Sequence, residues 1–473
     1  MKIVLVEVVP SKDTLTMNLV PPLGLGYIAS SLESKGFKVA LIDGVSYDFS
    51  LDKACQLIIN EKPDIVGFSS TTQARQRAVE LIKKVKHATG ALTVGGGVHF
   101  HATSFAALSA IPELDIVVKG EGEITLPDLA RTFFSKGDLS AVSGIVYREN
   151  EKIIETKERP FILDLDTLPM PAYHLYNLSK YSCTLEGTKI PAIGVISSRG
   201  CPNNCIFCAN RVLRKQTFRF RSPKKFVDEI AFLKNTYGYR AFDFWDDTLT
   251  MSKRHITEIC QELLQRKLEI QWFARARVNT IDKDVLTLMK RSGCFEIAYG
   301  IESGSEKILK TINKGASLQQ ARQAVRLTAE AGLRISNFFI VSLPGETLND
   351  IDETLKLMEE FSRIDNTRNY YCFAMIYPGT DLEISAKHEK LLPDDFNWYS
   401  PFYCQRNKIV GNDPKIPCYE NPALPLEQIK SYIIKSHSFT NKMKKTSKRI
   451  LKIRNFIELR NFAGLVFKYF SQK

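Results

Sequence analysis

The most informative segment of this sequence reads Ser197-Ser198-Arg199-Gly200-Cys201-Pro202-Asn203-Asn204-Cys205-Ile206-Phe207-Cys208. Three cysteines follow one another with the spacing C-x3-C-x2-C, directly after an apolar run over residues 190–196 that predicts a buried strand. Iron–sulfur clusters are normally held by four thiolates. A loop that offers only three leaves one iron open to a substrate, much as an open coordination position distinguishes a catalytic zinc site from a structural one.

A zinc site is the main alternative for these cysteines. A zinc knuckle, or half of a four-cysteine zinc site, would need a fourth ligand nearby, and neither cysteine nor histidine occurs between Ala209 and Arg254. The uneven spacing also differs from the paired C-x2-C pattern of zinc signatures. The segment therefore favours an iron–sulfur cluster.

Cys201, Cys205 and Cys208, with the aromatic Phe207 before the third cysteine, resemble the cluster loop of the radical S-adenosylmethionine (SAM) superfamily. The resemblance implies a [4Fe–4S] cluster whose open iron chelates the amino and carboxylate groups of SAM, with Phe207 beside SAM. It also implies that an electron from the cluster cleaves the sulfonium and releases a 5′-deoxyadenosyl radical. An external reductant such as flavodoxin or ferredoxin would supply that electron.

Composition and charge indicate a globular protein of a reducing compartment. With 473 residues, 44% of them hydrophobic and 25% charged, we expect two or three domains that fold without disulfides. Ten cysteines in a chain of this length, three of them in one loop, indicate reducing conditions. Glu7 interrupts the first apolar run, which argues against a signal peptide, and no run of eighteen apolar residues predicts a membrane span. We therefore expect a cytoplasmic protein.

Alternating strand and helix patterns fill residues 1–135. Strand-like runs at 2–7, 39–43, 64–69, 92–95 and 115–118 are separated by helical patterns at 26–35, 51–60, 75–87 and 105–110. This rhythm predicts an α/β domain with a doubly wound sheet of about five parallel strands. Ligands of such sheets bind beyond the carboxyl ends of the strands, so we expect a binding site there.

Glycine-containing segments recur through this region, at residues 22–27, 43–44, 63–67, 95–97 and 120–123. No G-x-G-x-x-G follows the first strand, so a dinucleotide-binding domain lacks its fingerprint. The order and spacing of the segments instead resemble the Rossmann-like cobalamin-binding domain found ahead of many radical enzymes. The resemblance implies a cobalamin site at Leu23, Ser69, Thr71, Gly96, Gly97 and Glu121. The alternative is a sheet whose glycines only make turns and which binds no cobalamin.

His99 and His101 are candidates for an axial ligand of cobalt. The D-x-H-x-x-G motif by which other cobalamin domains donate a histidine is absent from the sequence, and both histidines follow the fourth predicted strand. We therefore expect them at the start of a helix or on a polar surface, with no histidine on cobalt.

Residues 136–190 predict a connector with a hairpin at 144–147 and 152–155, followed by several prolines. The strand–helix rhythm then resumes over residues 191–380. Strands are predicted at 194–198, 241–245, 271–274, 296–301, 334–341 and 371–376. Helices are predicted at 223–236, 253–266, 282–291, 306–311, 318–331 and 348–361. Six such units predict a partial (β/α)6 barrel, in which the working residues lie at the carboxyl ends of the strands.

Polar residues follow three of the predicted barrel strands. Asp246 follows the second strand, Arg277 the third, and Glu302 with Ser303 the fourth. Carboxylates suit the ammonium and ribose hydroxyls of SAM, and a guanidinium suits its carboxylate, so we expect these residues to bind SAM. The alternative for each acid is to cap the following helix. Ser342 stands where relatives usually have glycine and is left out of the predicted site.

The remaining residues, 381–473, predict a mostly helical region with a basic end. Of the formal net charge of +13, residues 442–473 carry ten Lys or Arg against one acid. Aromatic and aliphatic residues lie between these charges, as in a helix on an anionic membrane surface. One alternative is a helix packed on the barrel; the other, contact with nucleic acid phosphates, is the weaker.

Together these features predict a cobalamin-dependent radical SAM enzyme, with methyl transfer to an unactivated carbon as the expected reaction. A radical oxidative cyclase is the enzymatic alternative, since the anaerobic porphyrin-ring cyclase shares this architecture. Methylthiotransferase relatives carry three further cluster cysteines, whereas only Cys55 and Cys183 precede the barrel here. A non-catalytic metal-cluster interaction module is the alternative of another class. The expected substrate is a small molecule or, if the tail meets a membrane, a lipid.

Overall fold

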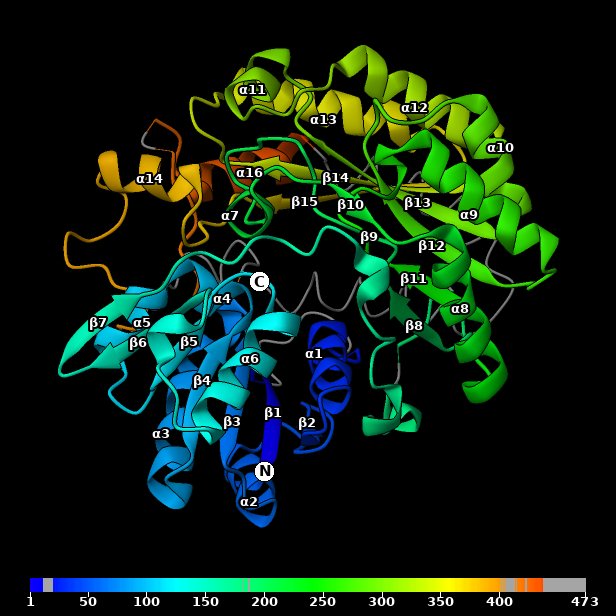
Figure 1. Cartoon of the computed structure of the whole chain (residues 1–473). Helices are drawn as coiled ribbons and strands as arrows, with labels where there is room; N and C mark the ends of the chain where they lie inside the picture. Colours follow the sequence, from blue (N-terminus) through cyan, green and yellow to red (C-terminus); the bar gives the residue numbers. More distant parts are fainter. Residues whose placement is uncertain are drawn as a thin grey trace.

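The computed structural model of the chain describes residues 1–11, 20–181, 183–185, 188–400, 402, 404, 413, 415–421 and 423–436. An N-terminal α/β domain is followed by a second α/β domain and a short C-terminal part (Figure 1). The predicted basic tail, residues 442–473, lies outside the described residues. Within those ranges, every helix is too short or too polar to cross a membrane.

The N-terminal sheet has the strand order β2-β1-β3-β4-β5-β6-β7. Its first five strands pair in parallel, which confirms the predicted doubly wound sheet. The predicted hairpin forms β6 and β7 and extends this sheet antiparallel to β5. The elements are β1 (Lys2–Val8), α1 (Leu23–Glu33), β2 (Lys38–Ile42), α2 (Leu51–Asn60), β3 (Ile65–Ser70), α3 (Arg75–Thr89), β4 (Leu92–Gly96), α4 (Gly97–Ala102), α5 (Ser104–Ala110), β5 (Ile116–Val118), α6 (Gly122–Phe134), β6 (Ile145–Glu149) and β7 (Lys152–Glu155).

Helices cover both faces of this sheet, which explains why β1 is apolar almost throughout. Successive side chains of a strand point to opposite faces. Ile3 and Leu5 pack in one core with residues of α1 and α6. Val4 and Val6 pack in another core with residues of α2 and α3.

The second sheet is parallel throughout, with the order β15-β14-β13-β12-β11-β8, and confirms the predicted partial barrel of six strands. Its helices lie on the outer side of the curved sheet (Figure 1). Side-chain caps at Ser222, Ser252, Asp282, Ser317 and Thr347 begin five of them. The elements are β8 (Ala192–Val195), α8 (Pro223–Tyr237), β11 (Ala241–Phe244), α9 (Lys253–Gln265), β12 (Gln271–Ala276), α10 (Lys283–Arg291), β13 (Cys294–Glu302), α11 (Glu306–Thr311), α12 (Leu318–Glu330), β14 (Arg334–Val341), α13 (Leu348–Ser362) and β15 (Thr367–Phe373).

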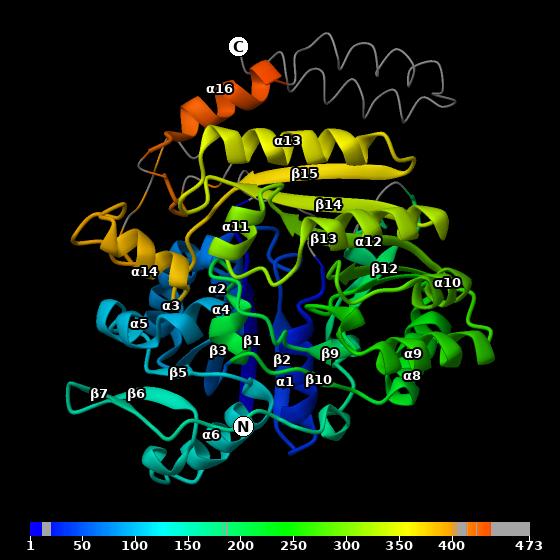
Figure 2. The ribbon, with the colours of Figure 1, turned by 90° about the horizontal axis from the view of Figure 1, so that it is seen from above.

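The carboxyl ends of the two sheets face each other. Figure 2 shows the N-terminal domain on the concave side of the barrel strands. Gln73, which follows β3, donates a hydrogen bond of 3.3 Å to the hydroxyl of Tyr377, which follows β15. The segment between β8 and α8 adds a small ribbon, β9 (Ser198–Arg199) and β10 (Arg219–Phe220), with the short helix α7 (Asn210–Arg214) between them. The C-terminal part contributes α14 (Asp381–His388) and α16 (Leu426–Ser436).

Candidate active site

The three cysteines lie on a loop that the short ribbon closes. Arg199, at the end of β9, pairs with Arg219, at the start of β10. Gly200 has φ of +94°, and a Cβ at this position would lie 2.2 Å from the carbonyl oxygen of Thr217. Only glycine fits there, so the ribbon determines the backbone directly before Cys201. Residues 200–218 are called the cluster loop below.

Cys201, Cys205 and Cys208 line one cavity of about 430 Å³ at the carboxyl ends of the barrel strands. Among the residues that the structure describes, no other cysteine lines this cavity. Across the described part of the chain, no three His, Cys, Asp or Glu side chains converge as ligands of a single metal ion would. An iron–sulfur cluster needs no such convergence, because each cysteine binds a different iron. Burial raises the pKa of Cys208 to about 11, so metal binding must displace a proton there.

A buried ion pair and an arginine form another part of the wall. Lys314 Nζ lies 2.7 Å from Glu302 Oε1, and Arg277 donates a hydrogen bond to the carbonyl of Lys314. Arg277 Nη1 lies 3.8 Å from Cys205 Sγ, while its Nε is buried without a hydrogen-bond partner. An unpaired guanidinium donor beside a cluster cysteine fits the carboxylate of a methionine group. Glu302 has φ of +71°, a conformation uncommon for residues other than glycine, and it lies at the irregularity in the pairing of β13 with β14.

The structure therefore brings Phe207, Arg277 and Glu302 together with the three cysteines, as the sequence predicts for residues around SAM. Lys314 was missed because it lies in the loop after α11, where no motif marks it. Asp247, the neighbour of Asp246 in the sequence, also lines the wall and was not among the predicted site residues. The remaining residues of the wall are Asn203, Asn210, Arg211, Thr248, Phe273, Arg275, Ala276, Ala298, Gly300 and Phe338.

Asp246 lies behind the cluster loop and does not line the cavity. It is fully buried, and its carboxylate accepts hydrogen bonds from the hydroxyls of Ser197 and Ser198. Burial raises the pKa of this carboxyl above its usual range. His255 Nε2 lies 3.1 Å from Ser197 Oγ and extends the network. The neighbouring Asp247 faces the cavity and accepts the N–H of Gly200 at 2.8 Å. The predicted contact of Asp246 with SAM stays a prediction, and the structure gives the residue a role in holding the loop.

Two serines lie just outside the cavity wall. Ser303 is fully buried and its Oγ accepts the N–H of Ser305 at 3.1 Å, so it shapes the turn after β13. Ser342 has φ of +67°, a conformation that favours glycine. Its hydroxyl donates to the carbonyl of Tyr419 at 2.7 Å.

Most of the predicted cobalamin residues lie at the carboxyl edge of the N-terminal sheet. Ser69 lies in β3, Gly96 ends β4, and Gly97 begins α4. A Cβ on Gly97 would lie 2.7 Å from Ser69 Oγ, whereas one on Gly96, or on Gly120 after β5, would meet no atom within 4 Å. The backbone at these two glycines is open to close approach by a ligand, which fits a flat macrocycle. Leu23 is buried at the start of α1, and Thr71 is exposed after β3.

The two histidines lie in the six-residue helix α4, where His99 is the third residue and His101 the last but one, so the predicted place at the start of a helix fits His99 only. The alternative prediction, a position on a polar surface, is wrong for His99, which is fully buried. Aromatic rings of the C-terminal part cover it, and the ring centroid of Tyr399 lies 5.5 Å from that of His99. Burial lowers the pKa of His99 to about 3. His101 Nδ1 accepts the N–H of Gly120 at 2.7 Å, and its Nε2 lies 3.2 Å from the carbonyl of Val212 in α7.

Glu121 is placed differently from the other predicted cobalamin residues. Its carboxylate is buried, and both oxygens are engaged by arginines of the barrel domain. A cobalamin contact through this side chain stays a prediction.

Sequence comparisons agree with this arrangement. Residues 195–358 match the Radical SAM superfamily, and residues 16–130 match the B12 binding domain. The chain is 32% identical over 454 residues to "Uncharacterized methyltransferase PH0819" of Pyrococcus horikoshii, covering 95% of this chain and 94% of the relative. The chain belongs to the cobalamin-binding radical SAM family.

A second relative of this radical SAM protein is the "Anaerobic magnesium-protoporphyrin IX monomethyl ester cyclase" of Rubrivivax gelatinosus, 29% identical over 394 residues, which are 80% of this chain and 69% of the relative. Among solved structures, the "Cobalamin-dependent S-adenosylmethionine radical enzyme OxsB with aqua-cobalamin and S-adenosylmethionine bound" superposes with a TM-score of 0.76 at 18% identity, over 99% of this chain and 71% of that one. This similarity shows a shared fold. The cofactors of the family are a [4Fe–4S] cluster, SAM and cobalamin, and the donors and open glycines described above fit them.

Proposed function

We propose that this radical SAM enzyme is a cobalamin-dependent methyltransferase that acts on a small molecule and takes electrons from an external reductant. The observation that carries the proposal is the three-cysteine cavity at the carboxyl ends of the barrel strands, the ends that face the B12-binding domain. Similarity over nearly the full length to a relative named as a methyltransferase supports methyl transfer. When bound, the three cofactors supply radical chemistry and a transferable methyl group, and the protein supplies binding, orientation and exclusion of water.

The residues of the cavity suit separate roles. Cys201, Cys205 and Cys208 would hold the cluster. The free Nε of Arg277 would bind the carboxylate of SAM, and Glu302, charge-balanced by Lys314, would bind its ammonium or ribose hydroxyls. The aromatic rings that line the same cavity, those of Phe207, Phe273 and Phe338, would exclude water from reactive species.

On the opposite side, cobalamin would lie against the carboxyl edge of the N-terminal sheet. Ser69 and Thr71 offer hydroxyls, Gly96 offers an approachable backbone beside Gly97, and Leu23 offers an apolar contact. A corrinoid held there would lie between the two sheets.

Oxidative cyclisation is the second candidate, because the similarity to the porphyrin-ring cyclase covers most of both chains. The two reactions differ in the fate of the methyl group of SAM. Only a methyltransferase must pass that group to cobalamin and then to a substrate.

The test is a label-transfer experiment on the anaerobically reconstituted full chain. The enzyme is incubated with cobalamin, a chemical reductant and SAM that carries a trideuterated methyl group, and the corrinoid is analysed by mass spectrometry. We expect labelled methylcobalamin and S-adenosylhomocysteine. Formation of 5′-deoxyadenosine without any labelled methylcobalamin would favour the cyclase, and C205A should abolish 5′-deoxyadenosine in either case.

For the basic tail we propose contact with an anionic membrane surface, which would favour a lipid substrate. Co-sedimentation with vesicles of anionic and neutral lipids tests this for the full chain and for a chain ending at Asn441. We expect binding of the full chain to anionic vesicles only. Equal binding of both chains would contradict membrane contact through the tail.

A further inference from the structure

One carboxylate of the B12-binding domain, that of Glu121, accepts hydrogen bonds from three arginines. Two of them flank the cluster loop and the third lies within it. Glu121 follows β5 and directly precedes α6, and its side chain is only 4% exposed. Its Oε1 accepts from Arg199 and from Arg214, at 3.0 Å each. Its Oε2 accepts from Arg219 and from the backbone N–H of Ile162, at 2.8 Å each.

The positions of these arginines bracket the iron ligands. Arg199 is separated from Cys201 by Gly200 alone, Arg214 ends α7, and Arg219 begins the return strand of the ribbon. Charge-assisted hydrogen bonds of this kind are strong and directional. Breaking a buried ion pair by removing one partner leaves an uncompensated charge, which disturbs the local structure strongly. The conformation of the cluster loop therefore depends on a residue of the other domain.

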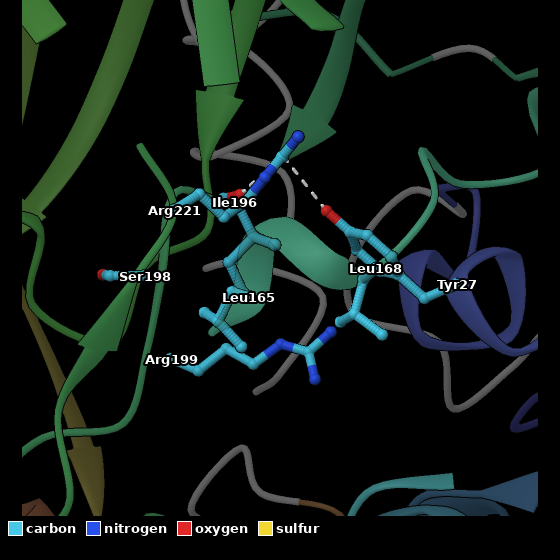
Figure 3. A pocket seen from close by; sticks show the side chains of 7 residues that line it. All are labelled: Tyr27, Leu165, Leu168, Ile196, Ser198, Arg199 and Arg221. Atoms are coloured by element: carbon cyan, nitrogen blue, oxygen red, sulfur yellow. Dashed lines mark hydrogen bonds between the residues drawn. The ribbon is translucent and has the colours of Figure 1, made fainter. Parts of the chain in front are cut away.

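Further contacts of Arg199 also come from the N-terminal domain. Glu123 accepts from Arg199 at 2.7 Å, and the guanidinium lies 5.1 Å from the ring centroid of Tyr27 in α1. Figure 3 shows the small pocket around these contacts, where Arg199 and Arg221 reach toward Tyr27 from the barrel side. The rest of its wall is formed by Leu165, Leu168, Ile196 and Ser198. Although burial acts to raise it, the arginines hold the pKa of Glu121 at about 2, so the carboxylate is charged at neutral pH.

A second contact, through His101, links Gly120, the residue before Glu121, to the cluster loop. Gly120 donates its N–H to His101, whose other nitrogen lies within hydrogen-bond distance of Val212 in α7. The carboxyl ends of β4 and β5, where cobalamin is expected, are thus connected directly to the cluster loop.

We propose that Glu121 is a positioning residue: it orders the cluster loop from the B12-binding domain and so sets the site in which the cluster and SAM bind. This proposal rests on the proposed function in one respect: it assumes that the three cysteines hold a cluster. The order of the loop in the cofactor-free chain is a separate property, and it can be measured without any metal.

The test uses E121Q, which removes the charge at nearly constant volume, in the full-length chain. Glu296 supplies the matched control, because it is equally buried, pairs with Arg334, and lies in β13 away from the cluster loop. Hydrogen–deuterium exchange of the cofactor-free proteins should be at least ~10-fold faster over residues 200–218 in E121Q than in wild type, and unchanged there in E296Q. R214Q, which removes one partly exposed partner, should give a smaller increase near α7.

After reconstitution, E121Q should bind less iron per chain and show an altered electron paramagnetic resonance spectrum, while E296Q should match wild type. Unchanged loop exchange in E121Q would overturn the proposal, as would equal effects of E121Q and E296Q. A loss of cobalamin affinity with an unchanged loop would also overturn it and identify Glu121 as a cobalamin contact. If the wild-type chain bound no iron, the proposed function would fail while the exchange comparison still tested the role of Glu121.

Discussion

Replacing Asp246 with alanine should loosen Ser197 and Ser198, which lead into the cluster loop, without removing any group from the cavity wall. The buried carboxylate of Asp246 accepts hydrogen bonds from the hydroxyls of Ser197 and Ser198 and from the N–H of Ser197. A hydrogen bond to a charged acceptor contributes about 1.5–3 kcal/mol, and each buried donor left unpaired costs about 1–3 kcal/mol. Because three donors share one acceptor, their losses do not add. We expect D246A to lower the free energy of unfolding by about 3–5 kcal/mol.

Urea unfolding of the cofactor-free full chain, followed by circular dichroism, measures this loss, and iron per chain after reconstitution reports on the loop. S198A is the matched control, since it removes one donor and leaves the carboxylate its other partners, and it should cost about 1 kcal/mol. Asp246 does not hold the loop if D246A unfolds like wild type and loads iron normally but binds SAM more weakly. That pattern would identify Asp246 as a direct contact of SAM.

Three further predictions concern residues near the carboxyl ends of β13 and β14. Burial raises the pKa of Glu346 to about 7 from 4.5, so the folded state holds a proton that the unfolded state releases. This group therefore contributes about 3 kcal/mol of stability at pH 4.5 that is lost as pH rises through 7, and the difference in unfolding free energy between wild type and E346Q should change by about 2 kcal/mol between pH 5.5 and 8. G300A places a Cβ 2.3 Å from Glu302 Oε1, so it should weaken SAM binding by ~10-fold in calorimetry while iron content stays normal. S342G relieves a strained φ but loses the hydrogen bond to Tyr419, so the free energy of unfolding should change by less than about 1 kcal/mol.

The architecture was predictable because its signals are local. Apolar runs and their spacing give both parallel sheets, and the spacing of three cysteines gives the metal loop. The two-residue strands β9 and β10 were not predicted, since two residues show no periodicity. Their pairing depends on Gly200 and on contacts with the other domain.

The direction in which a polar side chain turns was not predictable in the same way. Sequence places Glu121 and Asp246 at strand ends, where a ligand is expected, and both do lie there. Whether such a carboxylate faces a ligand or the protein depends on partners distant in sequence, such as Arg199 and Arg219 for Glu121. Arg277 and Glu302 were predictable as cavity residues, whereas Lys314, the partner of Glu302, carried no signal of its own.

Radical chemistry in this protein requires that Cys201, Cys205 and Cys208 hold a cluster with one iron open to SAM. Electron paramagnetic resonance of the reduced, reconstituted chain tests it directly, with and without SAM that carries ¹⁵N in its amino group. We expect a [4Fe–4S]⁺ signal that shifts on addition of SAM and shows coupling to the labelled nitrogen, with no such signal in C205A. A cluster signal that SAM leaves unchanged, or one that persists in C205A, would contradict it.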